Sequence, residues 1–512
     1  MGKLFDRSLE QVRYYEAKEN FEKNFSSFSL KNEVFTPPPH YKSKIPLISL
    51  GGVPLSGDGK NSENVFTDCF DSHTLIIGPT GSKKSRLVIM PTVRLLGSAK
   101  ESIIICDPKR EIYDRTAEFL KSKGYNIMVL NLRTPDEGDS WNPLTIAYNH
   151  YIHNEIDLAY EFANDVATNL ALQDIGGDKD PFWRNSFASL FLGLTILLFK
   201  YCYENKLPIN DVNIGNLIEL RKVLFQDSRE PNKNVCDYAA QDASIETLLS
   251  GTLSAPENTR RCILATFDEK VRMFTIRPSL MRMLSSNSIN FDIINEVPTA
   301  IFLVLPDEKT SYHGLVSIFV KQSYEYIISK LQQKNALPNK NNAYIRVNYV
   351  LDEFSSLPTI KDFPAMITAA RSRNIRFNIV IQSKHQLVLR YSEEADTIQS
   401  NCNNWLFLTS RELKLLDELV RLGGVKTDEL GKEILPISEL QRLDKDAGEI
   451  LILSGRYKPY VTRLPDIEEY DKNQFNSLKI QIRKQDLIDR KPIDFKTFFN
   501  VQKKSADAAL DW

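Results

Sequence analysis

Short β-branched runs alternate with helix-length stretches along this chain, and few architectures other than an α/β sheet accommodate that order. In the first block the runs are HTLII at 73–77, SIIIC at 102–106 and YNIMVLNL at 125–132. The stretches between them, 84–98 and 111–123, are long enough to cross over a sheet as helices. The pattern therefore predicts a βαβαβ unit with buried parallel strands.

A segment of more than a hundred residues without a comparable strand signal separates this block from a second one. After Trp141-Asn142-Pro143, helical spacing is seen at 152–173, 181–204 and 211–226. Alternation resumes with TAIFLVLP (299–306), YIRVNYVLDEF (344–354), FNIVIQS (377–383), NWLFLTS (404–410) and EILILSG (449–455). The sequence thus predicts an α/β fold with a mostly parallel sheet, interrupted by an inserted all-α domain.

These changes in pattern divide the chain into five predicted parts. Pro37-Pro38-Pro39 and the Gly/Ser-rich stretch 51–64 are turn and linker signals near the N-terminus. The parts are an N-terminal arm and linker (1–70), the first part of the α/β domain (71–145), the all-α domain (146–255), the second part of the α/β domain (256–465) and a C-terminal tail (466–512).

The charge balance excludes a uniformly basic nucleic-acid binder. The 512 residues include 65 Lys and Arg against 66 Asp and Glu, for a formal net charge of -1. Any contact with DNA must therefore come from a local basic patch or from a channel assembled from several subunits. The six cysteines lie far apart with no CxxC pair, which indicates reduced, mostly buried thiols in a cytoplasmic protein.

One apolar stretch needs a decision between a membrane span and a core helix. Residues 185–199 carry no charge but fall short of the roughly 20 apolar residues that cross a bilayer. Arg184 and Lys200 bracket the stretch, so we interpret it as a buried helix. The N-terminal residues carry charges throughout and form no signal peptide, so we expect a cytoplasmic protein.

A phosphate-binding loop follows the first strand. HTLII leads into Gly78-Pro79-Thr80-Gly81-Ser82-Lys83-Lys84-Ser85, and the apolar helix RLVIMPTVRLL comes next. In a P-loop the backbone N–H groups wrap the phosphates at the positive end of the following helix. Lys84 would then reach the β and γ phosphates of ATP, and Ser85 would hold Mg²⁺. The alternative is an ordinary glycine-containing strand-to-helix turn.

The loop departs from the pattern GxxxxGK[ST] at one position, because Lys83 stands where the second glycine is expected. Glycine allows close approach of the backbone to phosphates, and a side chain forced into that geometry costs roughly 1–3 kcal/mol. Lys83 either impairs hydrolysis for this reason or adds positive charge beside the triphosphate.

Three further strand ends carry polar groups. An acidic pair, Asp352 and Glu353, closes the strand YIRVNYVL and fits the roles of Mg²⁺ ligand and water-polarising base in a P-loop ATPase. Gln382 ends the strand FNIVI, either as a γ-phosphate or water sensor or as a turn or capping residue. Asp107-Pro108-Lys109 also ends a strand, but Asp-Pro is an ordinary turn signal and ranks below the others.

Several segments, in order, resemble the type IV secretion coupling proteins, ATPases that bring substrates to a conjugative or effector secretion channel. The matching stretches are LIIGPTGSKKS, IICDPKREIYDRTAEFLKSKGYNIMVLNL, SWNPL, FLVLPDEKTSYHGLVSIFVKQ, VNYVLDEFSSLPTIKDFPAMITAARSRNIRFNIVIQSKHQL and EILILSG. The similarity covers about 73–465. It implies a RecA-like motor domain with an all-α domain, six subunits in a ring, and ATP with Mg²⁺.

The resemblance also assigns residues by position within the matching segments. It implies that Lys84 and Ser85 contact phosphate and metal, that Asp352 and Glu353 are the Walker B pair, and that Gln382 is the sensor. Arg371 falls where the family places an arginine that reaches a neighbouring subunit's ATP, unless it belongs to a solvated cluster with Arg373 and Arg376. Family members typically begin with transmembrane helices, for which this sequence shows no counterpart.

Three functions are consistent with the sequence. The first is an ATP-driven coupling motor that delivers a relaxase–DNA complex or an effector protein to type IV secretion components at the inner face of the plasma membrane. The second is a non-hydrolysing, nucleotide-gated adaptor, and the third a soluble DNA-translocating ATPase unrelated to secretion. The DNA contact expected in the first and third is sequence-independent, on single strands or duplex. Phe182 and Trp183 in the all-α domain are interpreted as core residues rather than a base-stacking platform.

Overall fold

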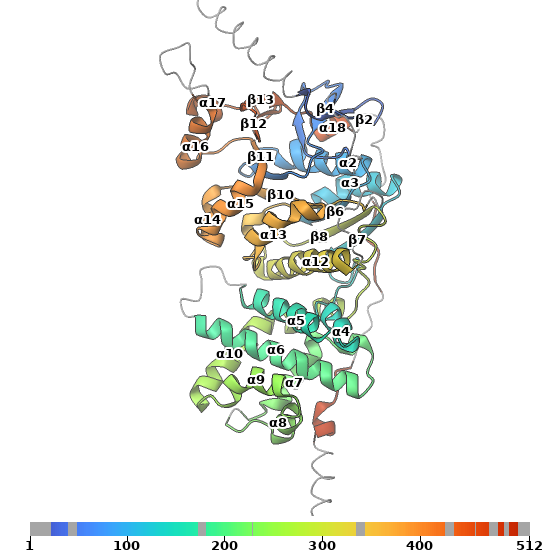
Figure 1. Cartoon of the computed structure of the whole chain (residues 1–512), viewed down its shortest axis with the longest axis vertical. Helices are drawn as coiled ribbons and strands as arrows, with labels where there is room; N and C mark the ends of the chain where they lie inside the picture. Colours follow the sequence, from blue (N-terminus) through green and yellow to red (C-terminus); the bar gives the residue numbers. More distant parts are fainter. Residues whose placement is uncertain are drawn as a thin grey trace, which may run out of the picture.

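The computed structural model describes residues 22–38, 49–172, 181–227, 229–333, 344–424, 435–455, 457–470, 480–485 and 491–499. The molecule is elongated, with an α/β domain at one end and a helical domain at the other (Figure 1). The helical domain is inserted in the sequence between two strands of one sheet, so the chain leaves the α/β domain and later returns to it.

A nine-stranded sheet forms the centre of the α/β domain, in the order β13-β12-β11-β5-β10-β9-β6-β8-β7. The strands are β5 (His73–Ile77), β6 (Ser102–Asp107), β7 (Asn126–Asn131), β8 (Thr299–Val304), β9 (Val347–Leu351), β10 (Ile375–Ile381), β11 (Cys402–Phe407), β12 (Glu449–Ser454) and β13 (Tyr460–Arg463). Strands β5 to β11 pair in parallel, whereas β12 and β13 are antiparallel. The predicted α/β fold with a mostly parallel sheet is confirmed.

Alternate residues of the buried strands face two separate hydrophobic layers, which is why both faces are covered by helices. One face packs on α2 (Met90–Ser98) and α3 (Glu111–Ser122). The other packs on α12 (His313–Gln333), α13 (Phe363–Ala370), α14 (Lys384–Tyr391), α15 (Glu394–Asn401) and α16 (Leu413–Gly423). The short helices α17 (Ile437–Leu440) and α18 (Ile467–Tyr470) complete the domain.

The segment expected to be an arm contains a small antiparallel sheet instead. Its order is β2-β1-β4-β3, with β1 (Ser26–Ser29), β2 (Val34–Thr36), β3 (Pro54–Ser56) and β4 (Asn64–Thr67). Its strands are only three or four residues long, which is too short for a clear alternation signal in the sequence. The Tyr460 hydroxyl donates to the Leu55 carbonyl at 2.6 Å and joins this sheet to β13.

A buried charge cluster also fixes the small sheet to the central one. The Glu101 carboxylate is 1% exposed and accepts hydrogen bonds from the Arg376 guanidinium at 2.5 Å and the Asn348 amide at 2.7 Å. Arg376 also donates to the carbonyls of Gly51 and Asp68, each at 3.1 Å. Arg376 is therefore not part of a solvated surface cluster, because β10 carries it into the interior.

Eight helices make up the helical domain in the described part of the chain. They are α4 (Thr145–Ile152), α5 (Ile156–Ala171), α6 (Pro181–Glu204), α7 (Ile214–Leu224), α8 (Lys233–Ala239), α9 (Ala243–Leu253), α10 (Glu257–Thr275) and α11 (Pro278–Met283). The helices continue past the predicted boundary at 255. Helix α10 belongs here because its apolar stripe, including Ile263 and Phe267, packs against α6 and α7.

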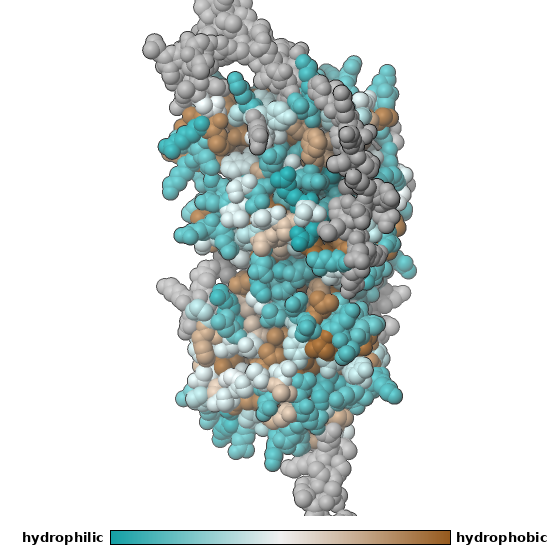
Figure 2. Space-filling model, viewed as in Figure 1, coloured by the Kyte–Doolittle hydropathy of each residue, from teal (hydrophilic) through white to brown (hydrophobic). Residues whose placement is uncertain are grey.

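Helix α6 contains the apolar stretch that raised the question of a membrane span. It is long and apolar enough to cross a bilayer by composition, but 78% of its most apolar window is buried within the protein. The predicted core helix agrees with this burial. At its start, however, Phe182 is 46% exposed and only Trp183 is partly buried, so the interpretation of both as core residues is wrong for Phe182. The face seen in Figure 2 is mainly hydrophilic, with small separate apolar patches.

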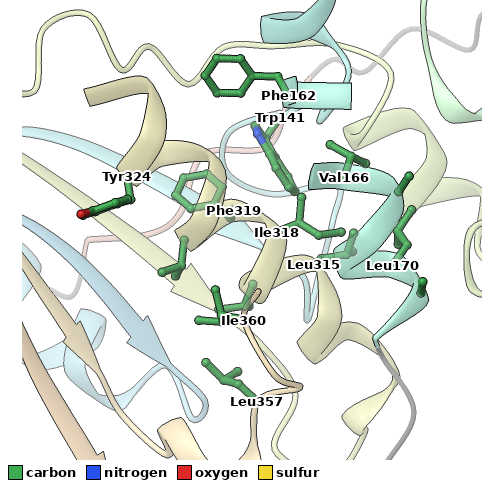
Figure 3. Packing of buried hydrophobic residues seen from close by; sticks show 14 of the residues in the cluster. Trp141, Phe162, Val166, Leu170, Leu315, Ile318, Phe319, Tyr324, Leu357 and Ile360 are labelled. Carbon is green, nitrogen blue, oxygen red and sulfur yellow. The ribbon is translucent and has the colours of Figure 1, made fainter. Parts of the chain in front are cut away.

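The two domains meet where α5 packs on α12. Figure 3 shows Val166 and Leu170 of α5 close to Leu315 of α12, with Leu357 and Ile360 nearby. The last two residues belong to the segment 354–362, which leads directly from the acidic strand end to α13. This segment is therefore sandwiched between the sheet and the helical domain.

Charged groups reinforce the same joint. The Lys321 ammonium on α12 is almost fully buried and lies 3.2 Å from the Asp362 carboxylate and 3.8 Å from the Asp165 carboxylate on α5. Lys361 adds an ion pair with Asp165 at 3.4 Å. Burial raises the pKa of Glu325, and the hydrogen-bonded Asp165 carboxylate beside it raises it further, although Lys321 opposes the shift. The raised pKa of Glu325 favours its neutral form, which reduces the negative charge at this joint.

The cysteines are unpaired, in agreement with the predicted reduced thiols. Cys69, Cys106, Cys202 and Cys402 are buried, Cys236 is half-buried and Cys262 is exposed. Burial raises the pKa of the Cys106 thiol well above its ordinary value. Buried neutral thiols of this kind act as small apolar groups.

Replacing Glu101 with Gln tests the buried charge cluster. The variant leaves the guanidinium of Arg376 without its carboxylate, which we expect to lower the free energy of unfolding by about 3–5 kcal/mol. Glu269→Gln is the matched control, since Glu269 and its partner Arg272 are both exposed by about two thirds and the pair is worth about 1 kcal/mol at most. Denaturant unfolding measures the free energy of unfolding of both variants. Equal losses would contradict the assignment of Glu101 to a buried charge cluster.

Candidate nucleotide site

Four neighbouring strands end at one edge of the central sheet and bring the predicted site residues together. The order β5-β10-β9-β6 is parallel throughout, so the carboxyl ends of these strands lie side by side. The P-loop follows β5, Gln382 follows β10, Asp352 follows β9, and Asp107 is the last residue of β6. Ligands of open α/β sheets bind at this edge.

A cavity of about 250 Å³ opens between these strand ends. It is lined by Pro79, Thr80, Gly81, Ser82, Lys83, Lys84, Ser85, Arg86, Asp107, Pro108, Lys109, Glu111, Ile112, Asp352 and Glu353. Every predicted P-loop residue except Gly78 lines it, together with both members of the acidic pair. Gly78 lies beneath the loop, where a Cβ would stand 2.6 Å from the Ser82 hydroxyl.

The loop backbone has the conformation that a phosphate cradle needs. Gly81 and Lys83 have φ of +82° and +66°, and alternating left- and right-handed residues turn successive N–H groups toward one concave side. The Lys84 ammonium donates to the carbonyls of Gly78 at 2.5 Å and Pro79 at 3.1 Å, which holds it across the loop. A π-helical turn at Ser85–Ile89 joins the loop to α2.

One orphaned polar atom shows that the cavity fits a phosphate group. The Ser82 hydroxyl is buried in the lining and has no hydrogen-bond partner within the described residues. An unpaired buried hydroxyl is costly, and a phosphate oxygen would satisfy it. The donors around it, namely backbone N–H groups and Lys84, are the kind that bind phosphates.

Lys83 occupies the strained position that the sequence identified. Its φ of +66° lies in the left-handed region, at a position where the pattern expects glycine. Its ammonium forms an ion pair with Asp446 at 2.7 Å, and Lys445 beside it lies 3.5 Å from the Gly81 carbonyl. The loop before β12 thus contacts the tip of the P-loop. Lys83 retains the left-handed backbone of the cradle, while Asp446 of the neighbouring loop neutralises its charge.

The two residues of the acidic pair, Asp352 and Glu353, differ in their surroundings and backbone conformation. Burial raises the pKa of Asp352 to about 6, against the opposing charge of Lys84. Burial likewise lowers the pKa of Lys84, while Asp352 and Glu353 act in the opposite direction. Glu353 has a left-handed backbone, with φ of +51°, and its N–H donates to the Asp352 carboxylate at 2.9 Å. A cation between Asp352 and bound phosphates would relieve the cost of burying this carboxylate.

A magnesium ion would need ligands beyond this protein. Among the described residues no group of three or more His, Cys, Asp and Glu side chains is placed to hold a metal. Ser85 and Asp352 both line the cavity and offer oxygen ligands. Mg²⁺ is commonly held by one or two protein oxygens together with phosphates and water, so this donor set fits a nucleotide-bound Mg²⁺.

Asp107 belongs to the site more closely than its ranking from sequence suggested. It lines the cavity with Lys109, and its carboxylate accepts a hydrogen bond from the Tyr113 N–H at 2.8 Å. Burial raises its pKa to about 7, and the nearby Asp352 contributes in the same direction. In the sequence, the Asp-Pro pair indicates only a turn. The strand order of the sheet shows that β6 lies beside β9, which brings Asp107 close to Asp352.

Gln382 and Arg371 lie outside the cavity lining. The Gln382 amide is 3.5 Å from the Glu353 carboxylate, so it contacts the site at its edge. Arg371 is exposed and precedes β10, whereas the P-loop and the acidic pair follow their strands. A seven-residue strand spans roughly 23 Å, which places Arg371 at the opposite edge of the sheet.

Replacing Asp107 with Asn tests its protonation in the folded chain. A carboxyl whose pKa is raised by folding supports the fold below its unfolded pKa and loses that contribution as pH rises through its folded pKa, here about 7. The variant's stability relative to wild type should therefore increase by about 2 kcal/mol between pH 5 and pH 8. Denaturant unfolding of the nucleotide-free chain at both pH values measures this. A constant difference would contradict the raised pKa.

Variants of Lys83 and Asp446 test whether the Lys83 ammonium pairs only with Asp446 or also contacts a bound phosphate. We expect Lys83→Gly, Lys83→Ala and Asp446→Asn each to bind ATP within about threefold of wild type, because an exposed ion pair contributes little and the cradle is made of backbone. Titration with a fluorescent ATP analogue measures the three affinities. A loss of about tenfold or more in Lys83→Ala with normal binding by Asp446→Asn would show instead that the ammonium contacts phosphate.

Comparison with known proteins places this chain in a family. The family model described as Type IV secretory system Conjugative DNA transfer matches residues 30–428. Among curated proteins, none matches the chain in sequence.

Solved structures of one conjugative coupling protein share the fold. They are the bacterial conjugative coupling protein TrwBdeltaN70 with sulphate (15% identity, TM-score 0.55), the plasmid coupling protein TrwB with the non-hydrolysable ATP analogue ADPNP (16%, 0.54) and TrwB with ADP and Mg²⁺ (17%, 0.55). Each aligns with 81% of this chain and 87–88% of its own. Because the family model spans most of the chain, the protein belongs to the type IV secretion coupling protein family of conjugative DNA transfer.

Proposed function

We propose that this protein is an ATP-driven coupling motor that delivers DNA or protein cargo to a type IV secretion channel. The observation that carries the proposal is the cavity in which a P-loop, the half-buried Asp352 carboxylate after β9 and the adjacent Glu353 meet. TrwB, which shares the fold, has been solved with an ATP analogue and with ADP and Mg²⁺, which supports ATP and Mg²⁺ as the ligands here.

Each residue has a separate role in ATP hydrolysis. The backbone cradle and Lys84 bind the phosphates, and Ser85 and Asp352 would hold Mg²⁺, which neutralises charge on the phosphates when bound. Glu353 orients the attacking water and accepts its proton. Gln382 contacts the Glu353 carboxylate and keeps it in position. In this division the Asp352 carboxylate would bind the cation, and the Glu353 carboxylate accepts the proton.

The position of Arg371 supports an oligomer. It lies at the sheet edge opposite the cavity of its own chain, so it can serve only the site of a neighbouring copy. We infer a homo-hexameric ring in which each Arg371 stabilises negative charge at the adjacent site. A ring also reconciles a net charge of -1 with DNA binding, because several chains together can line one basic channel.

The cargo of the motor is a relaxase–DNA complex or an effector protein, and its site of work is the inner face of the plasma membrane. There it docks on membrane components of the secretion system. The match to the family model for conjugative DNA transfer supports this part of the proposal. The helical domain is joined to the segment after Glu353 through α5 and α12, so it is placed to respond to the nucleotide site.

One observation favours a second function, a non-hydrolysing nucleotide-gated adaptor. Lys83 holds a left-handed conformation that glycine adopts at less cost, and its side chain is tied to Asp446. A loop restrained in this way can bind ATP without the rearrangement that turnover requires.

ATP turnover distinguishes the two functions. We expect turnover by the full chain to rise with protein concentration and with single-stranded DNA, and to fall about 10²–10⁴-fold in Glu353→Gln, which removes the base but keeps ATP binding. Lys84→Ala should lose ATP affinity by at least about tenfold, because a charged donor to phosphate is removed.

Three outcomes would contradict parts of this proposal. Wild-type turnover equal to that of Glu353→Gln, with ATP still bound, would identify the adaptor. Stimulation by DNA that persists unchanged from low to moderate salt would contradict a basic channel that binds DNA phosphates, since counterion release weakens such contacts as salt rises. Turnover that is stimulated by DNA but independent of secretion components would point to a translocase outside secretion.

A further inference from the structure

The C-terminal residues 491–499 lie against the helical domain, far along the chain from the segments that build it. They fall outside the family match, which ends at 428. The preceding segment 480–485 lies on the α/β domain, where the Gly138 N–H donates to the Arg483 carbonyl at 2.8 Å. Figure 1 shows the last described residues below the helical domain, near α8. The C-terminal region therefore touches both domains and is not the peripheral tail that its mixed charge suggested.

Three phenylalanines of this segment enter an aromatic pocket. Phe495 and Phe499 are 1% and 0% exposed, and Phe498 is partly buried beside them. The ring of Tyr201 on α6 lies 4.9 Å from Phe495 and 4.8 Å from Phe498 in edge-on contacts. Tyr238 on α8 lies 5.7 Å from Phe499. Such edge-on aromatic pairs add to the free energy gained by burial alone.

Two asparagines of the helical domain bind the backbone of the segment at its two ends. The Asn216 side chain on α7 accepts a hydrogen bond from the Ile493 N–H at 2.9 Å. The Asn234 side chain on α8 donates to the Phe499 carbonyl at 2.8 Å. Contacts of this type recognise a backbone without regard to most side chains. The pocket thus combines backbone recognition with aromatic anchors, as peptide-binding grooves do.

The segment carries its own helical signal. Asp494 accepts hydrogen bonds from the N–H and the hydroxyl of Thr497 at 3.0 Å and 2.6 Å, which caps a helical turn at 495–499. The first, fourth and fifth residues of this turn are phenylalanines, and these positions share one helix face. Helical peptides bind grooves through one apolar face of this kind.

We propose that the surface formed by α6, α7 and α8 is a docking groove for a short helical peptide with phenylalanines at its first, fourth and fifth positions, and that residues 491–499 occupy it in cis. A cargo protein that presents such a segment displaces the chain's own segment from the groove. Only the identification of the partner as cargo rests on the proposed function, because the groove and its occupant are described by contacts of this chain alone.

Peptide binding tests the groove in the full chain. The probe is a fluorescein-labelled peptide of residues 491–499 with blocked ends, and fluorescence anisotropy is the measurement. In wild type the tethered segment competes at an effective concentration on the order of millimolar. The double variant Phe495→Ala/Phe499→Ala empties the groove, and we expect it to bind the peptide at least about tenfold more tightly than wild type.

The control peptide carries alanine in place of Phe495 and Phe499 and should bind neither chain. Failure of the native peptide to bind a double variant that still unfolds cooperatively would overturn the proposal. Equal binding by wild type and variant would overturn occupancy in cis. Neither readout depends on ATP turnover, so failure of the groove and failure of the motor are distinguishable.

A second measurement applies if the double variant does not fold. A protease site introduced between residues 485 and 491 allows the segment to be cut from an otherwise native chain. We expect the cut segment to exchange with labelled peptide 491–499, so that the fluorophore co-elutes with the protein in gel filtration. A cut chain that retains its own segment and takes up no labelled peptide would show that the segment is a permanent part of the core and would overturn the proposal.

Discussion

Parallel pairing of β5, β10, β9 and β6 is the constraint on which the site depends. Parallel strands must all end at the same edge, so residues far apart in the chain, such as Lys84 and Asp352, are brought to one cavity. Burial at that edge then sets the chemistry, because it raises the pKa of Asp352 and Asp107 and lowers that of Lys84. The nucleotide-free site therefore holds charges whose desolvation a bound phosphate and cation would offset.

The connection from this site to the helical domain is short and tightly packed. Segment 354–362 begins directly after Glu353 and ends at Asp362, which pairs with the buried Lys321. The same lysine lies close to Asp165 on α5, so one ammonium on α12 links segment 354–362 to the helical domain. A movement of Glu353 would displace the residues packed at this joint, since close-packed interiors transmit strain. The segment that follows Glu353 is thus in direct contact with the helical domain through this joint.

The N-terminal sheet and the last described residues are attached to the rest of the protein in different ways. The N-terminal sheet is fixed by Arg376 and Glu101, a buried charge pair that is costly to open once formed. The C-terminal residues 491–499 are held instead by aromatic contacts and two backbone hydrogen bonds, which a similar peptide can replace. The first attachment is suited to a permanent structure and the second to exchange.

The sequence by itself determined the buried parallel strands of the central sheet, the P-loop and the acidic pair, because such strands are continuous apolar runs and their polar ends are adjacent in the chain. It also located Lys83, whose left-handed backbone the structure contains. Only the tertiary structure decided that Asp107 faces the cavity, that Arg376 is buried, that helices continue to Met283 and that the C-terminal phenylalanines fill a pocket. Each of these depends on which distant segment lies alongside, and local patterns of residues carry no information about that.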